Sequence, residues 1–491
     1  MHNKNIPTYS EPPTPKIYHC GTLTYTTRHL AILFFWLLWG DFCYTVMESV
    51  TGPIMQLKFQ ALNASNTEIG LILGTIPGIV YSFLNPIISF KSDRYRSAWG
   101  RRIPFILFTL PFLVLFLLAL AFGNQIGLAI AHLGIFGKTI SSDQVVILTL
   151  GTLLVSFTFF NTFVTSTFWY LFNDVVPEHL LARFMAWFRV ISTLSAAAYM
   201  YFIFPYSGTH STQIFVSAAL LYFVGFGLMC TNVKEGEYPP PTPYDGGGTG
   251  PIAAIKTYGK ETHSFMHYWY LWFCTFIGGI GGGVGMFGLF FSLALGLSMK
   301  QISVINTTVL IAVSILTIGT GWLADRFHPI RVVLVGATMG LLLVTPSGLI
   351  WLFWLPSPTI VFYVSLGIAI GLTAPAQALS GMWDPPMLMR LFPRSHYGQF
   401  CSTNAVWRAM GGIIGGGLSG AYLDIVTHFV GKERAYFYIP IWSLFFAIPS
   451  YGLLIGLYFS WKRYGGDDSY VPPVLTPKAQ ATTTPPQPIH T

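Results

Sequence analysis

Charged residues are scarce in this sequence. Asp, Glu, Lys and Arg make up 9% of its 491 residues, whereas an ordinary soluble domain carries about 25%. The shortage excludes a soluble domain as the main body of the protein. Apolar residues supply 53% of the chain and aromatic residues 16%, with a mean hydropathy of +0.58. These values are typical of membrane proteins, so the net charge of +8 indicates membrane topology and not nucleic-acid binding.

Residue patterns for catalysis or metal binding are also missing. The cysteines have neither metal-ligand spacing nor an even disulfide framework, and four of them lie in or beside apolar runs. The glycine-rich stretch 278–288 follows no strand pattern and contains no Lys-Ser/Thr pair, so it is not a phosphate-binding loop. No nucleophile elbow is present. We therefore expect no enzymatic activity, no cofactor and no resident metal.

Long apolar runs dominate what remains, and each is close to the roughly 20 residues that cross a bilayer. Twelve such spans are predicted, at approximately 30–55, 68–90, 103–123, 145–172, 183–204, 212–231, 267–295, 302–323, 331–354, 360–382, 399–426 and 437–461. With the N-terminus placed inside, 19 of the 26 Lys and Arg residues fall in inside segments, five fall outside and two lie within spans. This bias predicts that both termini are cytoplasmic. We expect an integral multi-pass protein of the plasma membrane, of the bacterial inner-membrane type, and a monomer.

The chain divides into two halves around a polar, Pro- and Gly-rich linker. Ser92-Asp93-Arg94 follows the second span, and Ala324-Asp325-Arg326 follows the eighth. Two sets of six spans with matching loops are typical of secondary transporters built from parallel repeats. The predicted organisation is a disordered cytoplasmic tail, a six-helix half, a cytoplasmic linker, a second six-helix half and a second disordered tail, at residues 1–28, 29–232, 233–265, 266–464 and 465–491.

Two carboxylates, Asp41 and Glu48, lie inside the first apolar run. A charge in hydrocarbon costs several kcal/mol, so such residues are usually functional. Their spacing of seven residues is nearly two helical turns, which points both the same way, roughly 10 Å apart. We predict that they bind the coupling ion, H⁺ or Na⁺. The alternatives are a structural ion pair with a basic residue of another helix and a hydrogen bond to unwound backbone.

Other polar residues within the spans suggest what is bound. A sugar needs hydrogen-bonding groups for its hydroxyls and flat aromatic surfaces for its C–H faces. The predicted substrate-binding residues are Asn161, Trp169, Gln377, Asn404 and Arg408. Arg408 is about nine residues into its span, roughly 14 Å deep, and is expected either to pair with Asp41 or Glu48 or to donate to substrate hydroxyls. The alternative for the aromatic and polar residues is ordinary packing in the membrane.

The loop after the second span supports a family resemblance. The segment from Asp93 to Arg102, DRYRSAWGRR, resembles the loop 2–3 signature of the major facilitator superfamily. Its spacing, with Ile103-Pro104-Phe105 after it, is closer to the branch of glycoside–pentoside–hexuronide cation symporters and sucrose-type transporters. Gly40-Asp41-Phe42-Cys43-Tyr44 is similar to the first helix of that branch, where an acidic residue recurs. GWLADR, ending at Arg326, resembles the second-half copy, although His328-Pro329 departs from its usual continuation and Ser89 replaces the usual Gly of the first copy.

The resemblance implies an all-α major facilitator fold with twelve transmembrane helices in two six-helix pseudo-repeat halves. It also implies a gate formed by the loop charges, which can pair across the halves when the inside is shut and separate when it opens. The predicted gating residues are Asp93, Arg94, Gly100, Arg101, Arg102, Asp325 and Arg326. Simple anchoring of a basic loop explains the arginines but not Asp93.

The predicted function is H⁺-coupled symport of a sugar or glycoside by alternating access. The partners expected are the lipid bilayer and a small-molecule substrate, with no nucleic acid. The first alternative is an H⁺ antiporter that exports a drug-like molecule or metabolite. An alternative of another class is a non-transporting membrane sensor or assembly factor, against which the short soluble segments argue.

Overall fold

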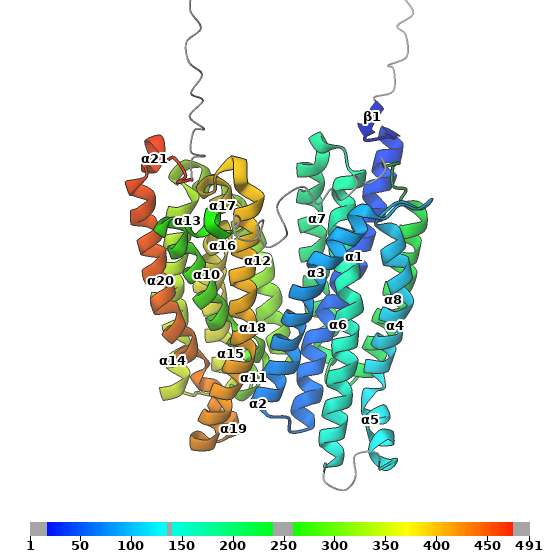
Figure 1. Cartoon of the computed structure of the whole chain (residues 1–491). Helices are drawn as coiled ribbons and strands as arrows, with labels where there is room; N and C mark the ends of the chain where they lie inside the picture. The colour runs from blue at the N-terminus through cyan, green and yellow to red at the C-terminus, as the bar shows by residue number, and fades with distance from the viewer. Residues whose placement is uncertain (1–16, 135–139, 239–258, 475–491) are drawn as a thin grey trace, which may run out of the picture.

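The computed structural model describes residues 17–134, 140–238 and 259–474 of the chain. Within them, twelve helical segments are long and apolar enough to cross a membrane. The predicted fold class is confirmed: two helical bundles of six spans each stand side by side (Figure 1). In Figure 1 the halves touch at the end where α2 and α11 lie and diverge toward the end that carries both termini.

The first half contains six spans, some of them built from several helices that follow one another directly. Its elements are α1 (Thr27–Ala61), α2 (Asn66–Gly70), η1 (Leu71–Thr75), α3 (Ile76–Arg94), α4 (Ile103–Ala121), α5 (Gly123–His132), α6 (Ser142–Val175), α7 (Glu178–Ala198), η2 (Tyr199–Ile203), η3 (Phe204–Tyr206) and α8 (Ser211–Asn232).

The second half repeats this plan. Its elements are α10 (Met266–Gly282), η4 (Gly283–Phe287), α11 (Gly288–Ala294), α12 (Met299–Phe327), α13 (Pro329–Met339), η5 (Gly340–Val344), α14 (Thr345–Phe353), α15 (Pro358–Ile368), η6 (Ala369–Thr373), α16 (Ala374–Ser380), η7 (Gly381–Trp383), α17 (Pro386–Leu391), η8 (Arg394–His396), α18 (Tyr397–Val430), α19 (Lys432–Ala435), η9 (Tyr436–Tyr438), α20 (Ile439–Arg463) and α21 (Gly466–Ser469).

Capping boxes begin three of the spans at the end away from the termini. Ser65, Ser141 and Ser298 each accept a hydrogen bond from the backbone three residues on, where a Glu or Gln side chain reaches back to the cap. This arrangement satisfies two of the amide groups that a helix start leaves unpaired. Ser65 and Ser298 start the second and eighth spans, so the pseudo-repeat extends to the way these helices begin.

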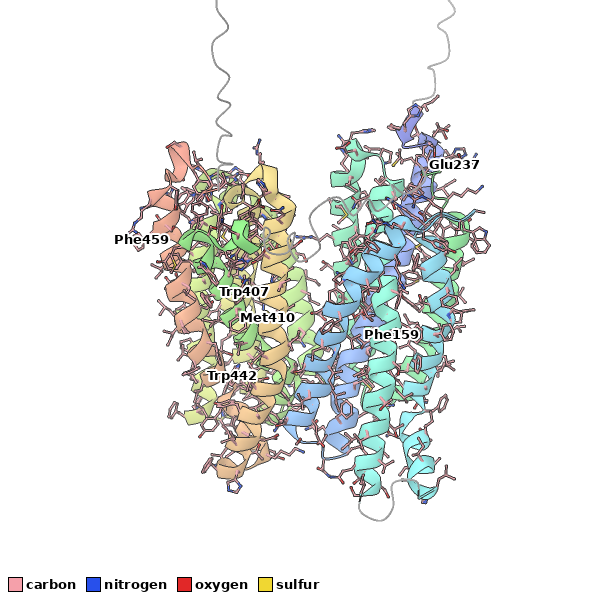
Figure 2. The ribbon with its side chains drawn as sticks, in the orientation of Figure 1. Phe159, Glu237, Trp407, Met410, Trp442 and Phe459 are labelled. Atoms are coloured by element: carbon pink, nitrogen blue, oxygen red, sulfur yellow. The ribbon has the colours of Figure 1, made fainter. Side chains whose placement is uncertain are left out.

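Large apolar side chains cover the outer surface of the bundle, as expected for contact with lipid. Ile318 is 80% exposed and Phe353 89%, and Phe459 projects from the outer side of α20 (Figure 2). The buried core of the first half is continuous, whereas the second half has a separate cluster, around Trp272 and Trp461, at the end that carries the termini.

Both tails differ from the prediction of disorder where the structure describes them. Residues 17–26 form an antiparallel hairpin, β1 (Ile17–Cys20) and β2 (Leu23–Thr26), turned at Gly21 with φ of +57°. The hairpin rests on the first half, because the Cys20 thiol lies 3.5 Å from the carbonyl oxygens of Asp174 and Val176. Alternating β-branched and aromatic residues favour this pairing.

At the other end of the chain, Tyr470 anchors the segment after α20 to the second half. Its hydroxyl donates to the Leu391 carbonyl at 2.8 Å and contacts Nε2 of His267 at 3.0 Å. Tyr268 donates to the Pro473 carbonyl at 3.1 Å. The prediction of a disordered tail from residue 465 therefore fails up to residue 474, and its remainder lies outside the described residues.

Candidate functional site

Asp41 and Glu48 both lie on α1, but the structure gives them different surroundings. Asp41 is 1% exposed and accepts hydrogen bonds from Ser192 of α7 at 2.7 Å and from Thr45 at 3.4 Å. These partners belong to the first half, so Asp41 ties α1 to α7. Of the two acids, Glu48 is the one that lines the central cavity.

Glu48 is held by α6. Its Oε1 accepts a hydrogen bond from Nδ2 of Asn161 at 2.5 Å, and its carboxyl group also hydrogen-bonds Tyr44. The Tyr44 hydroxyl lies 3.0 Å from Oγ1 of Thr165, which donates to the backbone carbonyl of Asn161 at 2.9 Å. One compact network thus joins the predicted ion-coupling residue to a predicted substrate-binding residue.

The other atom of the Asn161 amide is unsatisfied. Asn161 is 9% exposed, and its Oδ1 is buried with no hydrogen-bond partner in the described part of the chain. The amide presents its NH₂ group to Oε1 of Glu48, which leaves the oxygen of the amide unpaired. A buried acceptor without a partner costs about 1–3 kcal/mol, so the hydrogen bonds of this network are incomplete in this conformation.

The cavity that contains Glu48 lies between the halves. It has a volume of about 510 Å³ and is lined by residues of α1, α3 and α6 from the first half. Ala409, Gly412 and Ile413 of α18 close it from the second half. A site that both halves line changes shape when they move relative to one another.

The predicted residues of the second half lie apart from Glu48. Arg408 forms an ion pair with Asp384 and not with Asp41 or Glu48, and both partners are partly exposed. Next to it, Nε1 of Trp407 donates to Nε2 of His263 at 3.2 Å, and Trp407 is labelled on α18 in Figure 2. These four residues, which we call the second-half cluster, present a charge pair and aromatic rings.

The other predicted substrate residues have mixed surroundings. Asn404 is 3% exposed, and its Oδ1, like that of Asn161, has no partner in the described residues. Gln377 is exposed. Trp169 is 42% exposed and packs edge-on against Phe188 of α7, and it is not among the residues that line the cavity around Glu48. The structure therefore brings Asn161 to Glu48 but not Trp169.

The loop charges of the first half form a network within that half. Arg102 pairs with Asp93 and, at 3.1 Å, with Asp174 of α6, and Arg101 also pairs with Asp174. The hydrogen bond to Asp174 raises the pKa of Arg101. Asp174 was not identified from the sequence, although an acid at the end of a span beside a basic loop is the available signal.

Glu235, in the segment after α8, caps the start of α4. Its Oε1 accepts from the backbone amides of Arg102 and Ile103 at 2.8 and 2.7 Å, and its Oε2 from that of Arg101 at 2.9 Å. A carboxylate at a helix N-terminus is favourable because it meets unpaired N–H groups. Gly100 has φ of +99°, and a Cβ there would collide with the Glu235 side chain. Sequence reasoning selected the glycine but missed its partner.

In the second half, the corresponding loop has a more exposed charge network. Asp325 is paired with Arg390 at 3.1 Å, but its side chain is 83% exposed, and Arg326 lies over the rings of Trp322 and Phe327. Arg94, the remaining predicted gating residue, lies over Phe90 of its own helix. Between described residues, the ion pairs of Arg101, Arg102, Arg331 and Arg390 at this end each join residues of one half.

The opposite end is closed by contacts across the halves. Asp424 of α18 accepts four hydrogen bonds, of 2.5–2.9 Å, from the backbones and side chains of Asn66 and Thr67 at the start of α2. Tyr436 donates to Oδ1 of Asn66 at 3.0 Å. Gly70 and Gly416 let the backbones of the two helices meet, because a Cβ at Gly70 would collide with the Gly416 carbonyl. We call this set of contacts the interhalf clasp.

Two six-span halves around a cavity, in contact at one end and diverging at the other, form an architecture typical of transporters that are built from two repeats. The comparisons agree with this class. A model of the Major Facilitator Superfamily matches residues 37–416, so the chain belongs to that superfamily. It is a transporter and not an enzyme.

Solved structures share the fold at low sequence identity. A mutant of the nucleoside transporter NupG is 12% identical, with a TM-score of 0.63 over 86% of this chain and 99% of that one. A bacterial homologue of the lysosomal transporter Spinster, inward-facing and unoccupied, has 12% identity and a TM-score of 0.61 over 88% and 98%. A D-xylose–proton symporter has 14% identity and a TM-score of 0.57 over 86% and 97%. No curated protein sequence matches the chain.

Proposed function

We propose that this protein is a symporter that couples the entry of H⁺ to the uptake of a sugar or glycoside, within the cation-symporter and sucrose-type branch of the superfamily. The observation that carries the proposal is that only one of the two polar atoms of the Asn161 amide is hydrogen-bonded. Its NH₂ group binds Glu48, and its buried oxygen has no partner. A substrate hydroxyl that donates to this oxygen would be one side chain away from the ion-coupling carboxyl group.

The few hydroxyl hydrogens available for hydrogen bonds around Glu48 favour a proton as the coupling ion. The hydroxyl hydrogen of Thr165 is already donated to the backbone of Asn161. Tyr44 has one hydrogen for its two neighbours, Thr165 and Glu48. When Glu48 carries the proton it can donate to Tyr44, which can then donate to Thr165, whereas the ionised carboxylate accepts from Tyr44 instead.

The same groups argue against Na⁺. A sodium site is built from oxygen lone pairs, whereas Glu48 meets the NH₂ group of Asn161. Loss of the proton would free the Tyr44 hydrogen to turn from Thr165 to Glu48. Protonation thereby changes contacts between α1 and α6, which is how one site can link ion and substrate binding.

The second-half cluster does not line the cavity around Glu48, but its groups suit the binding of a sugar. Arg408 and Asp384 offer donors and acceptors to hydroxyls, and Trp407 offers a flat face. We assign the end that carries the termini to the cytoplasm, from the distribution of Lys and Arg. The conformation described would then be inward-open, with the interhalf clasp shut on the outside. The similarity to a D-xylose–proton symporter supports only the fold.

The test uses vesicles that contain the purified protein and a pH-sensitive dye. Addition of mono- and disaccharides without an imposed gradient should acidify the interior when a transported sugar is present. Glu48→Gln should abolish acidification. Asp143→Asn, which neutralises an exposed acid at the start of α6, is the matched control and should behave as the unaltered protein.

Sugar uptake that acidifies the interior equally in the Glu48→Gln variant would refute the coupling role. Asn161→Ala should weaken sugar binding in the same vesicles, because the substrate loses its acceptor. If no sugar acidifies the interior and the vesicles show proton-driven efflux of amphiphilic compounds, the protein is an exporter and the proposal is refuted.

A further inference from the structure

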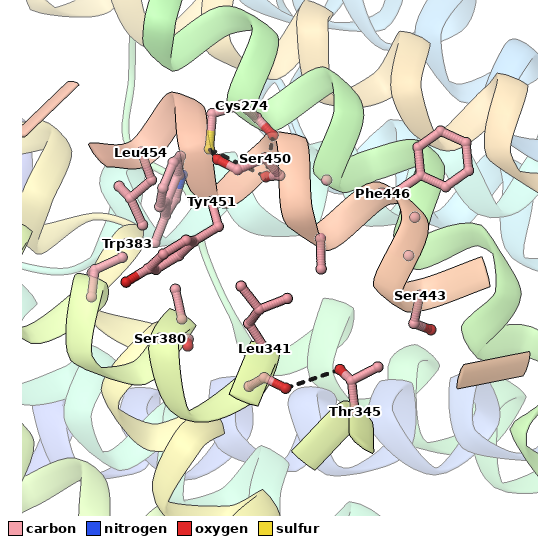
Figure 3. A pocket seen from close by; sticks show the side chains of 17 residues that line it. Cys274, Leu341, Thr345, Ser380, Trp383, Ser443, Phe446, Ser450, Tyr451 and Leu454 are labelled. Atoms are coloured by element: carbon pink, nitrogen blue, oxygen red, sulfur yellow. Dashed lines mark hydrogen bonds between the residues drawn. The ribbon is translucent and has the colours of Figure 1, made fainter. Parts of the chain in front are cut away.

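A second cavity lies inside the second half, away from Glu48. It is partly open, has a volume of about 510 Å³ and is lined by α10, the span from α13 to α14, the end of the α16 span, and α20 (Figure 3). Pockets that hold drug-sized ligands have volumes of about 300–1,000 Å³. None of the residues that line it is charged.

Glycines open this space. A Cβ added at Gly282 of α10 or at Gly340 of η5 would meet no atom within 4 Å, and both residues line the cavity. In the first half, the span that corresponds to α13 and α14 is α4, whose Leu113 and Leu117 are fully buried in the core. The cavity is therefore a feature of the second half, where the two core clusters are separate.

The cavity is elongated along the membrane-spanning direction. Its lining on α20 extends from Ser443 to Leu454, a rise of roughly 16 Å at 1.5 Å per residue. Figure 3 shows the aromatic rings of Trp383 and Tyr451 near one end and Phe446 toward the other. Rings and glycine backbone make smooth walls that suit a rigid, flat apolar body.

Hydroxyl groups stand at both ends. Those of Tyr451 and Ser450 are already hydrogen-bonded, to Thr338 and Cys274. Ser380 and Ser443 also line the cavity, and their hydroxyls have no hydrogen-bond partner in the part of the chain that the structure describes. A ligand with a polar group at one end would find a partner within the cavity itself.

We propose that this cavity binds a neutral polycyclic alcohol from the surrounding membrane, of the class formed by sterols and by the hopanoids that replace them in bacteria. The partly open cavity is large enough to admit a drug-sized molecule from the membrane. The absence of charge in the lining disfavours a phospholipid headgroup, a fatty acid or a cationic amphiphile. A rigid ring system with one hydroxyl matches both the walls and the free serines. This inference does not depend on the proposed transport function.

The experiment uses the full chain in phosphatidylcholine vesicles with a photoreactive cholesterol analogue. Labelling should fall on peptides of α10 and α20 that line the cavity, and excess unlabelled cholesterol should compete with it. Gly340→Leu, which fills the cavity without a clash, should reduce labelling of these peptides at least tenfold. Gly367→Leu is the matched control, because Gly367 is another glycine of a spanning helix with open space around it but lies outside the cavity.

Equal labelling of the cavity peptides in the Gly340→Leu and Gly367→Leu variants would overturn the proposal, as would labelling confined to the lipid-facing surface. Loss of labelling in excess diacylglycerol would identify an acyl chain as the occupant and would equally refute a sterol. If Gly340→Leu does not elute as a single species, Gly282→Leu fills the same space from α10 and takes its place.

Discussion

Replacement of Asp424 by Asn should open the interhalf clasp. The carboxylate accepts four hydrogen bonds, two on each oxygen. An asparagine oxygen can keep the two from Asn66, and its NH₂ group can donate to the Thr67 hydroxyl, but the Thr67 backbone N–H loses its acceptor. A hydrogen bond to a charged group contributes about 1.5–3 kcal/mol, so loss of one, with the others no longer charge-assisted, removes at least about 1.5 kcal/mol from this conformation. Because each 1.4 kcal/mol is a factor of ten, the equilibrium should shift by at least about tenfold toward the state in which the clasp is open.

Spin labels at residues 61 and 433, in a background without the native cysteines, report the separation of the halves at this end by electron–electron distance measurement. The unaltered protein should give mainly the short distance, and Asp424→Asn mainly a longer one. Asp143→Asn removes an acid at the same end that makes no contact with the second half, and should leave the distribution unchanged. An unchanged distribution for Asp424→Asn would show that glycine packing alone holds this end shut.

Three further predictions concern other contacts. Gly416→Ala should lengthen the same distance, because its Cβ would come within 2.9 Å of the Gly70 carbonyl oxygen; a short distance would contradict this reasoning. Lys58→Met should lower the unfolding temperature of the purified protein, since the ammonium group donates to the last carbonyls of α4 at 2.7 and 3.3 Å and its loss costs about 1–3 kcal/mol; an unchanged melting curve would exclude this role. Burial and the nearby arginines lower the pKa of His328 to about 4, below the roughly 6.5 of an unfolded chain. The unfolded state then binds more protons, so the free energy of unfolding should fall as pH drops from about 6.5 to about 4. His328→Asn, which keeps a side-chain acceptor beside the Ile330 amide but does not titrate, should flatten that slope in unfolding measured at pH 5 and pH 8.

The number of spans and the two-half plan could be predicted because they depend on local hydrophobicity and on charge in short loops. Glu48 and Asn161 could each be selected as polar residues within a span. Their contact could not, because they are 113 residues apart and helical periodicity does not determine which helices become neighbours. For the same reason the contacts of Asp424 could not be predicted, because its partners lie 358 and 357 residues away.

Two further features were not predicted. Lys58, one of the five basic residues assigned to the outside, lies in the last turn of α1 and is 8% exposed. A lysine just after an apolar run has no local sign that it will reach the carbonyl end of another helix. The hairpin at 17–26 did have a signal, because Gly21 divides two short runs of alternating residues. The polar and Pro-rich composition of the surrounding tail concealed it.

The anchored tails have a consequence for how motion of this carrier can be observed. The hairpin that ends in β2 is fixed to the first half through Cys20, and the segment that ends at Val474 is fixed to the second half through Tyr470. Each tail must therefore move with its own bundle. Energy transfer between fluorophores attached beside these anchors would report the distance between the two bundles at the end where they diverge. The transport cycle could thus be followed in real time without any label inside the membrane.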